Sequence, residues 1–258
     1  MSEEEQRLPG GNVGGAVRVG DTVRRSTGPW TPDVHALLRH LAGRLPGVPR
    51  VLGYDEAGRE VLSYLPGRVP DIDTETLTPG QLTALVRWTR AFHTAVAGFP
   101  LAGAWRYFPM PDATLIGHND IAPYNACFDG DELVGVFDWD LAGPSNPLME
   151  LAFVAWNGVP LWRDDGPETA AARLRLIADA YRGYAPERIL RAVPDRIRIM
   201  LDGIPVAAAA GDRGMANLLA QGEPERSRRS LADLERRLPA IERSLAQSRR
   251  ARRQLSGK

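Results

Sequence analysis

A chain of 258 residues with 43% hydrophobic and 25% charged residues has the composition of a water-soluble globular protein, long enough for one large domain or two smaller lobes. No apolar run approaches the roughly 20 residues that span a bilayer, and the acidic start Ser2-Glu3-Glu4-Glu5 has no apolar segment behind it. We therefore expect a cytoplasmic protein with no membrane partner. A single cysteine, Cys127, excludes an internal disulfide and a multi-cysteine zinc site.

The net charge is zero, but it is unevenly distributed along the chain. The segment from Glu223 to Lys258 holds eleven basic and five acidic residues, which leaves six net negative charges on residues 1–222. The net negative charge of residues 1–222 favours binding of a cationic small molecule over binding of nucleic acid. Lys258 is the only lysine, so a cation that contacts a phosphate inside the fold has to be an arginine.

The first quarter of the chain predicts a small antiparallel sheet with one helix. Alternating apolar residues and turn signals indicate strands at 16–19, 22–25, 47–54 and 59–65. Thr31-Pro32 starts a helix whose apolar positions recur at helical spacing. Before the first strand lies a glycine-dense segment that includes Gly11 and Gly14; glycines of this kind either cradle phosphates or simply form turns.

The second part of the chain predicts mostly helices. Helical patterns start at Thr78-Pro79 and at Glu150, and others cover 168–182, 187–193, 195–210 and 230–253. His93 lies within the first of these, where a packed or surface histidine is expected rather than a catalytic one. Acidic residues at 164, 165 and 168 suit either a cationic substrate or, in the favoured interpretation, a solvated helix start.

The residues best suited to catalysis or metal binding lie between positions 118 and 140. His118-Asn119-Asp120 is followed five residues later by Asn125, and then by a predicted hairpin of residues 126–128 and 134–137 around Asp129-Gly130-Asp131. The hairpin should bring Asn125 close to Asp138, which supplies two oxygen ligands for a hard cation such as Mg²⁺. Asp120 is the candidate base. The bland alternative is an acid-rich surface hairpin.

This order of residues, with Val136-Phe137-Asp138-Trp139-Asp140 at its end, resembles the aminoglycoside phosphotransferase family of kinase-like enzymes. In that family the fragment usually reads His-Gly-Asp, then Asn, then Ile-Asp-Trp with a second acid. The resemblance implies a bilobal protein-kinase-like α+β fold, with a small N-terminal β-sheet lobe (1–66) and a larger, mostly helical C-terminal lobe (67–258). It also implies Mg²⁺-dependent transfer of a γ-phosphoryl group from ATP or GTP to a hydroxyl of a small molecule, such as an aminoglycoside or another antibiotic.

The resemblance also suggests roles for individual residues. Asp120 would take the substrate's proton and His118 would support its loop, while the expected metal ligands are Asn125, Asp138 and, as an auxiliary acid, Asp140. The residues expected to contact the nucleotide are Arg24, nearest the strand position usually held by lysine, the loop glycines Gly11 and Gly14, and the hinge residues Ser63, Tyr64 and Leu65.

Two departures from the family pattern leave an alternative function open. The interior lysine is absent, and the helix that should supply its glutamate partner reads Val34-His35-Ala36, so the strand arginine is held either by Asp33 or by phosphates alone. A nucleotide-binding pseudoenzyme or regulatory module is therefore the alternative. A protein kinase is disfavoured, because no Asp-Phe-Gly or Ala-Pro-Glu segment brackets an activation loop.

Overall fold

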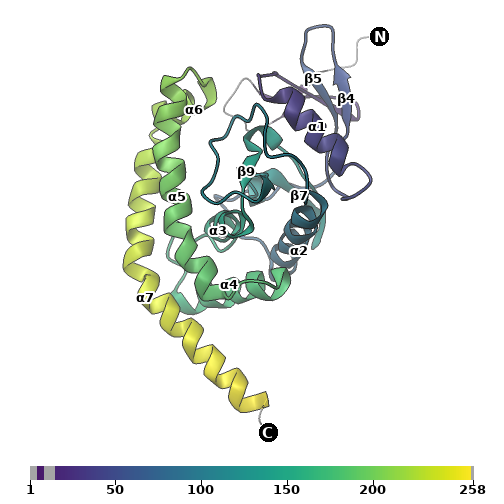
Figure 1. The fold of residues 1–258 in the computed structure, drawn as a ribbon. Helices are drawn as coiled ribbons and strands as arrows, with labels where there is room; N and C mark the ends of the chain where they lie inside the picture. The colour runs from purple at the N-terminus through teal and green to yellow at the C-terminus, as the bar shows by residue number, and fades with distance from the viewer. Residues whose placement is uncertain (1–4, 9–14, 257–258) are drawn as a thin grey trace.

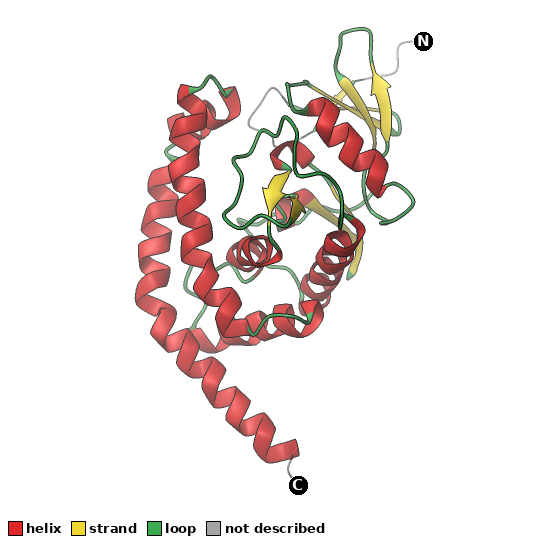
Figure 2. Ribbon diagram, viewed as in Figure 1, coloured by secondary structure: helices red, strands yellow, loops and turns green. Residues whose placement is uncertain are grey.

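The computed structural model describes residues 5–8 and 15–256, and its N-terminal part is an antiparallel sheet (Figures 1 and 2). Five strands pair in the order β1-β2-β3-β5-β4. Their bounds are β1 (Gln6–Arg7), β2 (Val17–Val19), β3 (Thr22–Arg25), β4 (Val51–Tyr54) and β5 (Glu60–Ser63). The strands predicted at 16–19, 22–25, 47–54 and 59–65 are confirmed within a few residues.

One helix, α1 (Thr31–Leu41), packs beside this sheet in the figures. Pro32 stands in its first turn, where its missing N–H costs nothing. Its buried face contains the predicted apolar stripe, namely Val34, Leu37, Leu38 and Leu41, together with His35. The helix therefore contributes both to the core and, through His35, to a polar cluster described below.

The second part is helical, as predicted. Its helices are α2 (Pro79–Ala95), α3 (Pro147–Gly158), α4 (Pro167–Tyr181), α5 (Pro186–Ala209), α6 (Arg213–Ala220) and α7 (Glu223–Ser256). Thr78 and Gln81 form a capping box at the start of α2, and the Asn146 side chain caps α3 by accepting from Leu148 N and Met149 N. Figure 1 shows α5 and α7 running side by side, with the end of α7 extending beyond the other helices.

Helix α5 continues where the sequence predicts a break at Pro194. The reason is a long buried stripe on both sides of the proline, consisting of Ile189, Leu190, Val193, Ile197 and Leu201. The packing of this stripe outweighs the local cost of one missing hydrogen bond in the helix interior. The prediction of two separate helices over 187–193 and 195–210 is thus wrong.

Four short strands lie between α2 and α3 in the chain, and the residues of chemical interest lie in or next to them. β7 (Ala126–Asp129) and β8 (Glu132–Val136) form the predicted hairpin, with Ala126 opposite Val136. β6 (Leu115–Gly117) pairs antiparallel with β9 (Gly143–Ser145), so that Gly117 lies opposite Gly143. Short 3₁₀ turns, η1 (Pro123–Asn125) and η2 (Trp139–Leu141), stand next to the hairpin.

The fold class is the expected bilobal α+β arrangement of a small sheet followed by a larger helical part. The sheet ends at Ser63 and the first helix of the second part starts at Pro79, so a boundary at residue 66 stays a prediction within this interval. Within the part of the chain that the structure describes, none of the helices has the length and apolar character needed to cross a membrane.

Candidate active site

The segment His118-Asn119-Asp120 follows strand β6 and is held by one carboxylate; it is hereafter called the catalytic loop, after the role that the resemblance implies for Asp120. Glu150 on α3 is 1% exposed and accepts from His118 N at 3.0 Å and from Asn119 N at 2.8 Å. Burial opposes ionisation of Glu150, but the contact with His93 and the bond from the Asn119 amide hold its pKa below the ordinary value. Gly117 allows this close approach, because a Cβ there would stand 2.8 Å from Glu150 Cδ. His93 is packed in the interior, one of the two placements expected for it, and its Nδ1 lies 2.8 Å from Tyr181 OH.

His118 supports the loop from inside, as the resemblance implies. Its Nε2 donates to Phe137 O at 3.0 Å, and its Nδ1 accepts from Asp120 N at 3.3 Å. The ring packs on Trp139, with 4.6 Å between the ring centroids. Burial lowers the pKa of His118, which favours the neutral tautomer that these two bonds require. His118 therefore ties the loop to the segment that carries Asp138.

Asp120 is held in one orientation by two side-chain donors. Tyr124 OH donates to its Oδ1 at 2.9 Å, and Asn125 Nδ2 donates to its Oδ2 at 2.8 Å. Burial, and next the negative charge of Asp138, raise the pKa of Asp120 to about 7. A carboxylate with such a pKa is a stronger base than an ordinary aspartate and can accept a proton near neutral pH.

Asn125 and Asp138 meet at the open end of the β7–β8 hairpin, as predicted. Phe137 N donates to Asn125 O at 2.9 Å, which fixes the two segments against each other. Asp138 has a positive φ of 62°, a conformation that aspartate tolerates better than most residues, and its side chain is 40% exposed. The turn thus presents a carboxylate outward beside Asn125.

The arginine that reaches these acids is Arg25, not Arg24. Arg25 Nη2 lies 3.0 Å from Asp138 Oδ1 and 2.6 Å from Asp140 Oδ1, whereas Arg24 lies 4.0 Å from Glu5. Neighbouring strand residues point to opposite faces, so only one of the two can face the hairpin. The register expected from the sequence is therefore off by one residue.

The glutamate partner of this arginine comes from the neighbouring strand rather than from the helix. Glu60 on β5 stands opposite Arg25 in the sheet, with 3.6 Å between Glu60 Oε1 and Arg25 Nε. His35 on α1 donates to the other oxygen of Glu60 at 2.8 Å, and both side chains are buried. Asp33, the expected alternative, instead accepts from Ala104 N at 2.7 Å. Glu60 was not predicted from the sequence, because the family pattern places the partner carboxylate on the helix, although pairing across neighbouring strands also brings residues together.

Asp140 is fully engaged by arginines. Its Oδ1 pairs with Arg25, and its Oδ2 accepts from Arg106 Nη1 at 3.2 Å. Arg106 in turn makes a two-pronged contact with Asp212 at 2.7 and 2.8 Å and lies over the Trp30 ring. Both carboxylate oxygens of Asp140 are thus paired with arginines in this structure, and its role near a metal stays a prediction.

The donor set fits Mg²⁺ only when substrate phosphates complete it. Over residues 5–8 and 15–256 no three His, Cys, Asp or Glu side chains gather in a way that could hold a metal ion. The partly exposed carboxylate of Asp138, which also pairs with Arg25, and the amide oxygen of Asn125 are the candidate ligands. Mg²⁺ is commonly held by one or two carboxylates together with substrate phosphates and waters, so this pair suits it.

The contacts of the residues expected to bind the nucleotide base and phosphates do not test that role. Ser63 N donates to Arg50 O at 2.9 Å and Tyr64 N to Asp21 O at 2.8 Å, so these two amides are engaged within the protein. Leu65, beside them, is half-buried. Gly11 and Gly14 lie outside the described residues.

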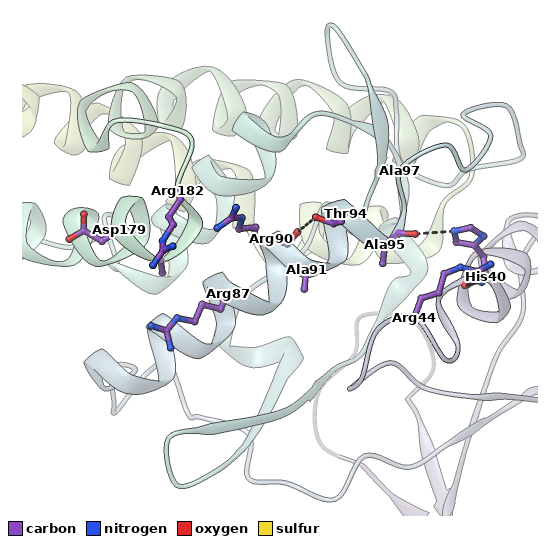
Figure 3. Close-up of a pocket in the computed structure, with 11 residues that line it drawn as sticks. His40, Arg44, Arg87, Arg90, Ala91, Thr94, Ala95, Ala97, Asp179 and Arg182 are labelled. Atoms are coloured by element: carbon purple, nitrogen blue, oxygen red, sulfur yellow. Dashed lines mark hydrogen bonds between the residues drawn. The ribbon is translucent and has the colours of Figure 1, made fainter.

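A cavity of about 870 Å³ lies elsewhere, on the solvent side of α2 (Figure 3). It is lined by the end of α1, the end of α4 and the exposed face of α2, with Arg44, Arg87, Arg90 and Arg182 around it. The opposite face of α2 carries Trp88 and Phe92, which pack on Trp139 next to Asp138. Helix α2 therefore separates this cavity from the catalytic loop.

Two of the three acidic residues that could hold a cationic substrate pair with arginines. Asp165 pairs with Arg163 at 3.0 Å, and Asp164 lies 3.8 Å from Arg237. This agrees with the favoured interpretation of a solvated helix start.

Comparison with known proteins connects this geometry to a family. The family model described as "Phosphotransferase enzyme family" matches residues 103–190, which include the catalytic loop and the hairpin. A trifolitoxin immunity protein from Rhizobium leguminosarum bv. trifolii is 34% identical over 197 residues, covering 69% of this chain and 74% of that protein.

Solved structures show the same fold at low identity. A choline/ethanolamine kinase family protein from Mesorhizobium loti has a TM-score of 0.60 at 17% identity, covering 94% of this chain and 91% of that one. Aminoglycoside 2'-phosphotransferase-IIIa in complex with GDP has a TM-score of 0.58 at 14% identity, covering 90% and 94%. The two-part fold is thus a kinase-like fold.

Proposed function

This chain belongs to the phosphotransferase enzyme family, and on that premise we propose that it transfers the γ-phosphoryl group of ATP or GTP to a hydroxyl of a small molecule. The observation that carries the proposal is Asp120, oriented by Tyr124 and Asn125 and raised to a pKa of about 7, next to the outward-facing Asp138. Phosphoryl transfer needs an aligned proton acceptor and charge neutralisation more than it needs covalent chemistry.

In this proposal Asp120 receives the proton of the substrate hydroxyl and orients its oxygen for in-line attack. The two bonds from Tyr124 and Asn125 leave the carboxylate little freedom to rotate, so the attacking oxygen meets a fixed acceptor. Asn125 and Asp138 would hold Mg²⁺, which when bound neutralises negative charge on the phosphates. His118 keeps the loop and the Asp138 segment in register through Phe137 O.

Arg25 takes the phosphate-contacting role that the sequence reasoning gave to Arg24. Its guanidinium already stands between the sheet and the acids of the hairpin, with Glu60 behind it. Arginine presents a planar fork, so its contact with phosphate is bidentate and more directional than that of lysine. Gly11, Gly14, Ser63, Tyr64 and Leu65 remain proposed nucleotide contacts.

For the acceptor we propose a hydroxyl-bearing antibiotic or toxin, so that phosphorylation protects the cell. The support comes from the relative named as an immunity protein against trifolitoxin and from solved structures named as aminoglycoside phosphotransferases. The net negative charge of residues 1–222 favours a cationic acceptor. Use of ATP or GTP also suits the cytoplasmic residence that the sequence predicts.

A screen of aminoglycosides, macrolides and hydroxyl-bearing peptide antibiotics, scored by release of nucleoside diphosphate, tests the proposal. Asp120→Asn serves as the matched inactive control, because it keeps the shape of the side chain. Release that depends on both the acceptor and Asp120 supports the proposal, and release that is equal in the two proteins contradicts it.

The second candidate is the nucleotide-binding pseudoenzyme. One observation favours it. Arg25 pairs with Asp138, and Arg25 and Arg106 both pair with Asp140, so arginines of the protein itself neutralise the two acids. Nucleotide hydrolysis measured with and without Mg²⁺ separates the two functions. An enzyme shows Mg²⁺-dependent hydrolysis, whereas a pseudoenzyme binds the nucleotide but does not hydrolyse it.

A further inference from the structure

Arg196 on α5 is a buried cation with no carboxylate beside it. Its residue is 1% exposed, and across the described part of the chain no carboxylate oxygen comes within 4.0 Å of its guanidinium. It lies over the Phe153 ring, with 4.4 Å between its Cζ and the ring centroid. Burying an ion without a partner ion is costly, and packing alone would be served as well by methionine or leucine. The charge therefore needs another explanation.

The hydrogen bonds of Arg196 supply that explanation, because they lead to the catalytic loop. Nη2 donates to Asn119 O at 2.7 Å, and Nη1 donates to Tyr107 OH at 3.1 Å. Asn119 directly precedes Asp120. A charged donor to this carbonyl is about twice as strong as a neutral one, so Arg196 fixes the peptide that joins Asn119 to Asp120.

Asn119 is held at three further points, two of them made by its side chain. It adopts φ of 63°, and its N–H donates to Glu150. Its Nδ2 donates to Leu141 O at 3.1 Å and to Gly143 O at 3.2 Å. The glycine usual at this position in the family allows the same backbone conformation but has no amide to make these bridges. In this chain the residue before the base is therefore bonded to the turn that follows Asp138 and Asp140.

We propose that Arg196 and Asn119 are positioning residues that together hold Asp120 at a fixed place relative to the Asp138–Gly143 turn. This inference rests on the proposed function, since it assigns the two residues to the geometry of phosphoryl transfer. Arg196 restrains the loop through a backbone carbonyl, from the side of α5. Asn119 restrains it through its side chain, from the side of the turn.

The test compares Arg196→Met with Arg198→Met in the full chain. Arg198 is exposed on the same helix and pairs with Asp195 and Glu235, so it controls for loss of an arginine. We expect Arg196→Met to lower Mg²⁺-dependent turnover at least tenfold while MgATP affinity changes less than threefold. Arg196→Lys should recover part of the turnover, because one ammonium can still donate to Asn119 O. Equal losses of turnover and MgATP affinity, or none, would overturn the positioning role.

Hydrogen–deuterium exchange supplies a readout that does not depend on activity. Exchange in residues 115–125 should accelerate at least tenfold in Arg196→Met and stay unchanged in Arg198→Met. Asn119→Gly keeps the backbone conformation but removes both bridges, so it should accelerate exchange in residues 138–145 as well; unchanged exchange there refutes the Asn119 part. If the unmodified protein shows no turnover at all, the proposed function fails and the exchange data alone decide the inference.

Discussion

Replacing Asp120 by asparagine should make the folded protein more stable at alkaline pH while abolishing its activity. The pKa of Asp120 is raised from 3.8 to about 7, so the folded state resists ionisation of a carboxyl that ionises freely when unfolded. This destabilisation is absent below about pH 4 and grows as the pH rises to about 7. Asparagine carries no charge and so does not suffer it.

The size of the effect follows from the pKa values. Each tenfold difference in proton affinity is worth about 1.4 kcal/mol, so a pKa of about 7 in place of 3.8 corresponds to on the order of 4 kcal/mol at pH 8. Against this, the new amide faces the Asn125 Nδ2 donor and loses one hydrogen bond, worth about 1 kcal/mol. The loss of this hydrogen bond is similar at both pH values, so the difference between pH 4 and pH 8 measures the contribution of the ionised carboxylate to the free energy of unfolding.

Urea unfolding of both proteins at pH 4 and pH 8 measures this difference. Asp129→Asn, an exposed carboxylate on the same hairpin, should leave the free energy of unfolding unchanged. Turnover of the Asp120 variant should fall by roughly 10²- to 10⁴-fold. If the variant gains no stability relative to the unmodified protein between pH 4 and pH 8, the pKa of Asp120 is not raised in the folded protein. Near-normal turnover would refute its catalytic role directly.

The other predictions concern the metal ligands, the arginine of β3 and Gly117 of β6. Asp138→Ala should abolish Mg²⁺-dependent nucleotide binding in calorimetry and Asn125→Ala should weaken it; unchanged MgATP affinity in the first variant would mean that the metal binds elsewhere. Arg25→Ala should weaken nucleotide binding by about 1.5 to 3 kcal/mol, as for a hydrogen bond to a charged group, with Arg24→Ala as the control; a larger loss in the control would restore the register expected from the sequence. Gly117→Ala should destabilise the fold by about 1 to 3 kcal/mol in thermal or urea unfolding, because its methyl would meet a side chain of β9 at 2.7 Å; wild-type stability would show that the strand pair yields easily.

The parts of the fold that depend on local signals were predictable from the sequence. The proline in the first turn and the apolar spacing defined α1, although Thr31, expected as its N-cap, is its first residue and the N-cap Trp30 makes no side-chain cap. The Thr78-Pro79 start and the apolar spacing defined α2, and the Asp-Gly turn defined the β7–β8 hairpin. Short strands such as β6 and β9 were missed, because three residues carry no periodicity and the pair is stabilised only by contacts between distant segments. Helix α6 was missed as well, since its eight residues are mostly exposed and few of them are buried in the core.

The part of the candidate site made by residues close in sequence was predictable, and the part assembled from distant segments was not. Asp120, Asn125 and Asp138 share one supersecondary unit, so their spacing was sufficient. Arg25 required the register of a strand to be known to one residue, and a one-residue error reverses the face of every side chain. Arg196 gave no signal at all, because an arginine in an Arg-rich amphipathic helix looks like a solvated residue until tertiary packing buries it.

The contacts of Arg25 also bear on how the protein is made. The arginine and Asp138 are 113 residues apart, so the ribosome completes the whole sheet long before the acid emerges. Of the carboxylates that pair with Arg25 within the described residues, Glu60 alone has been synthesised by then. A five-stranded sheet of this size has little core of its own, and its inward-facing cation is neutralised fully only by residues of the later hairpin. The contacts that complete the charge balance of Arg25 can therefore form only after the chain has been synthesised past residue 140.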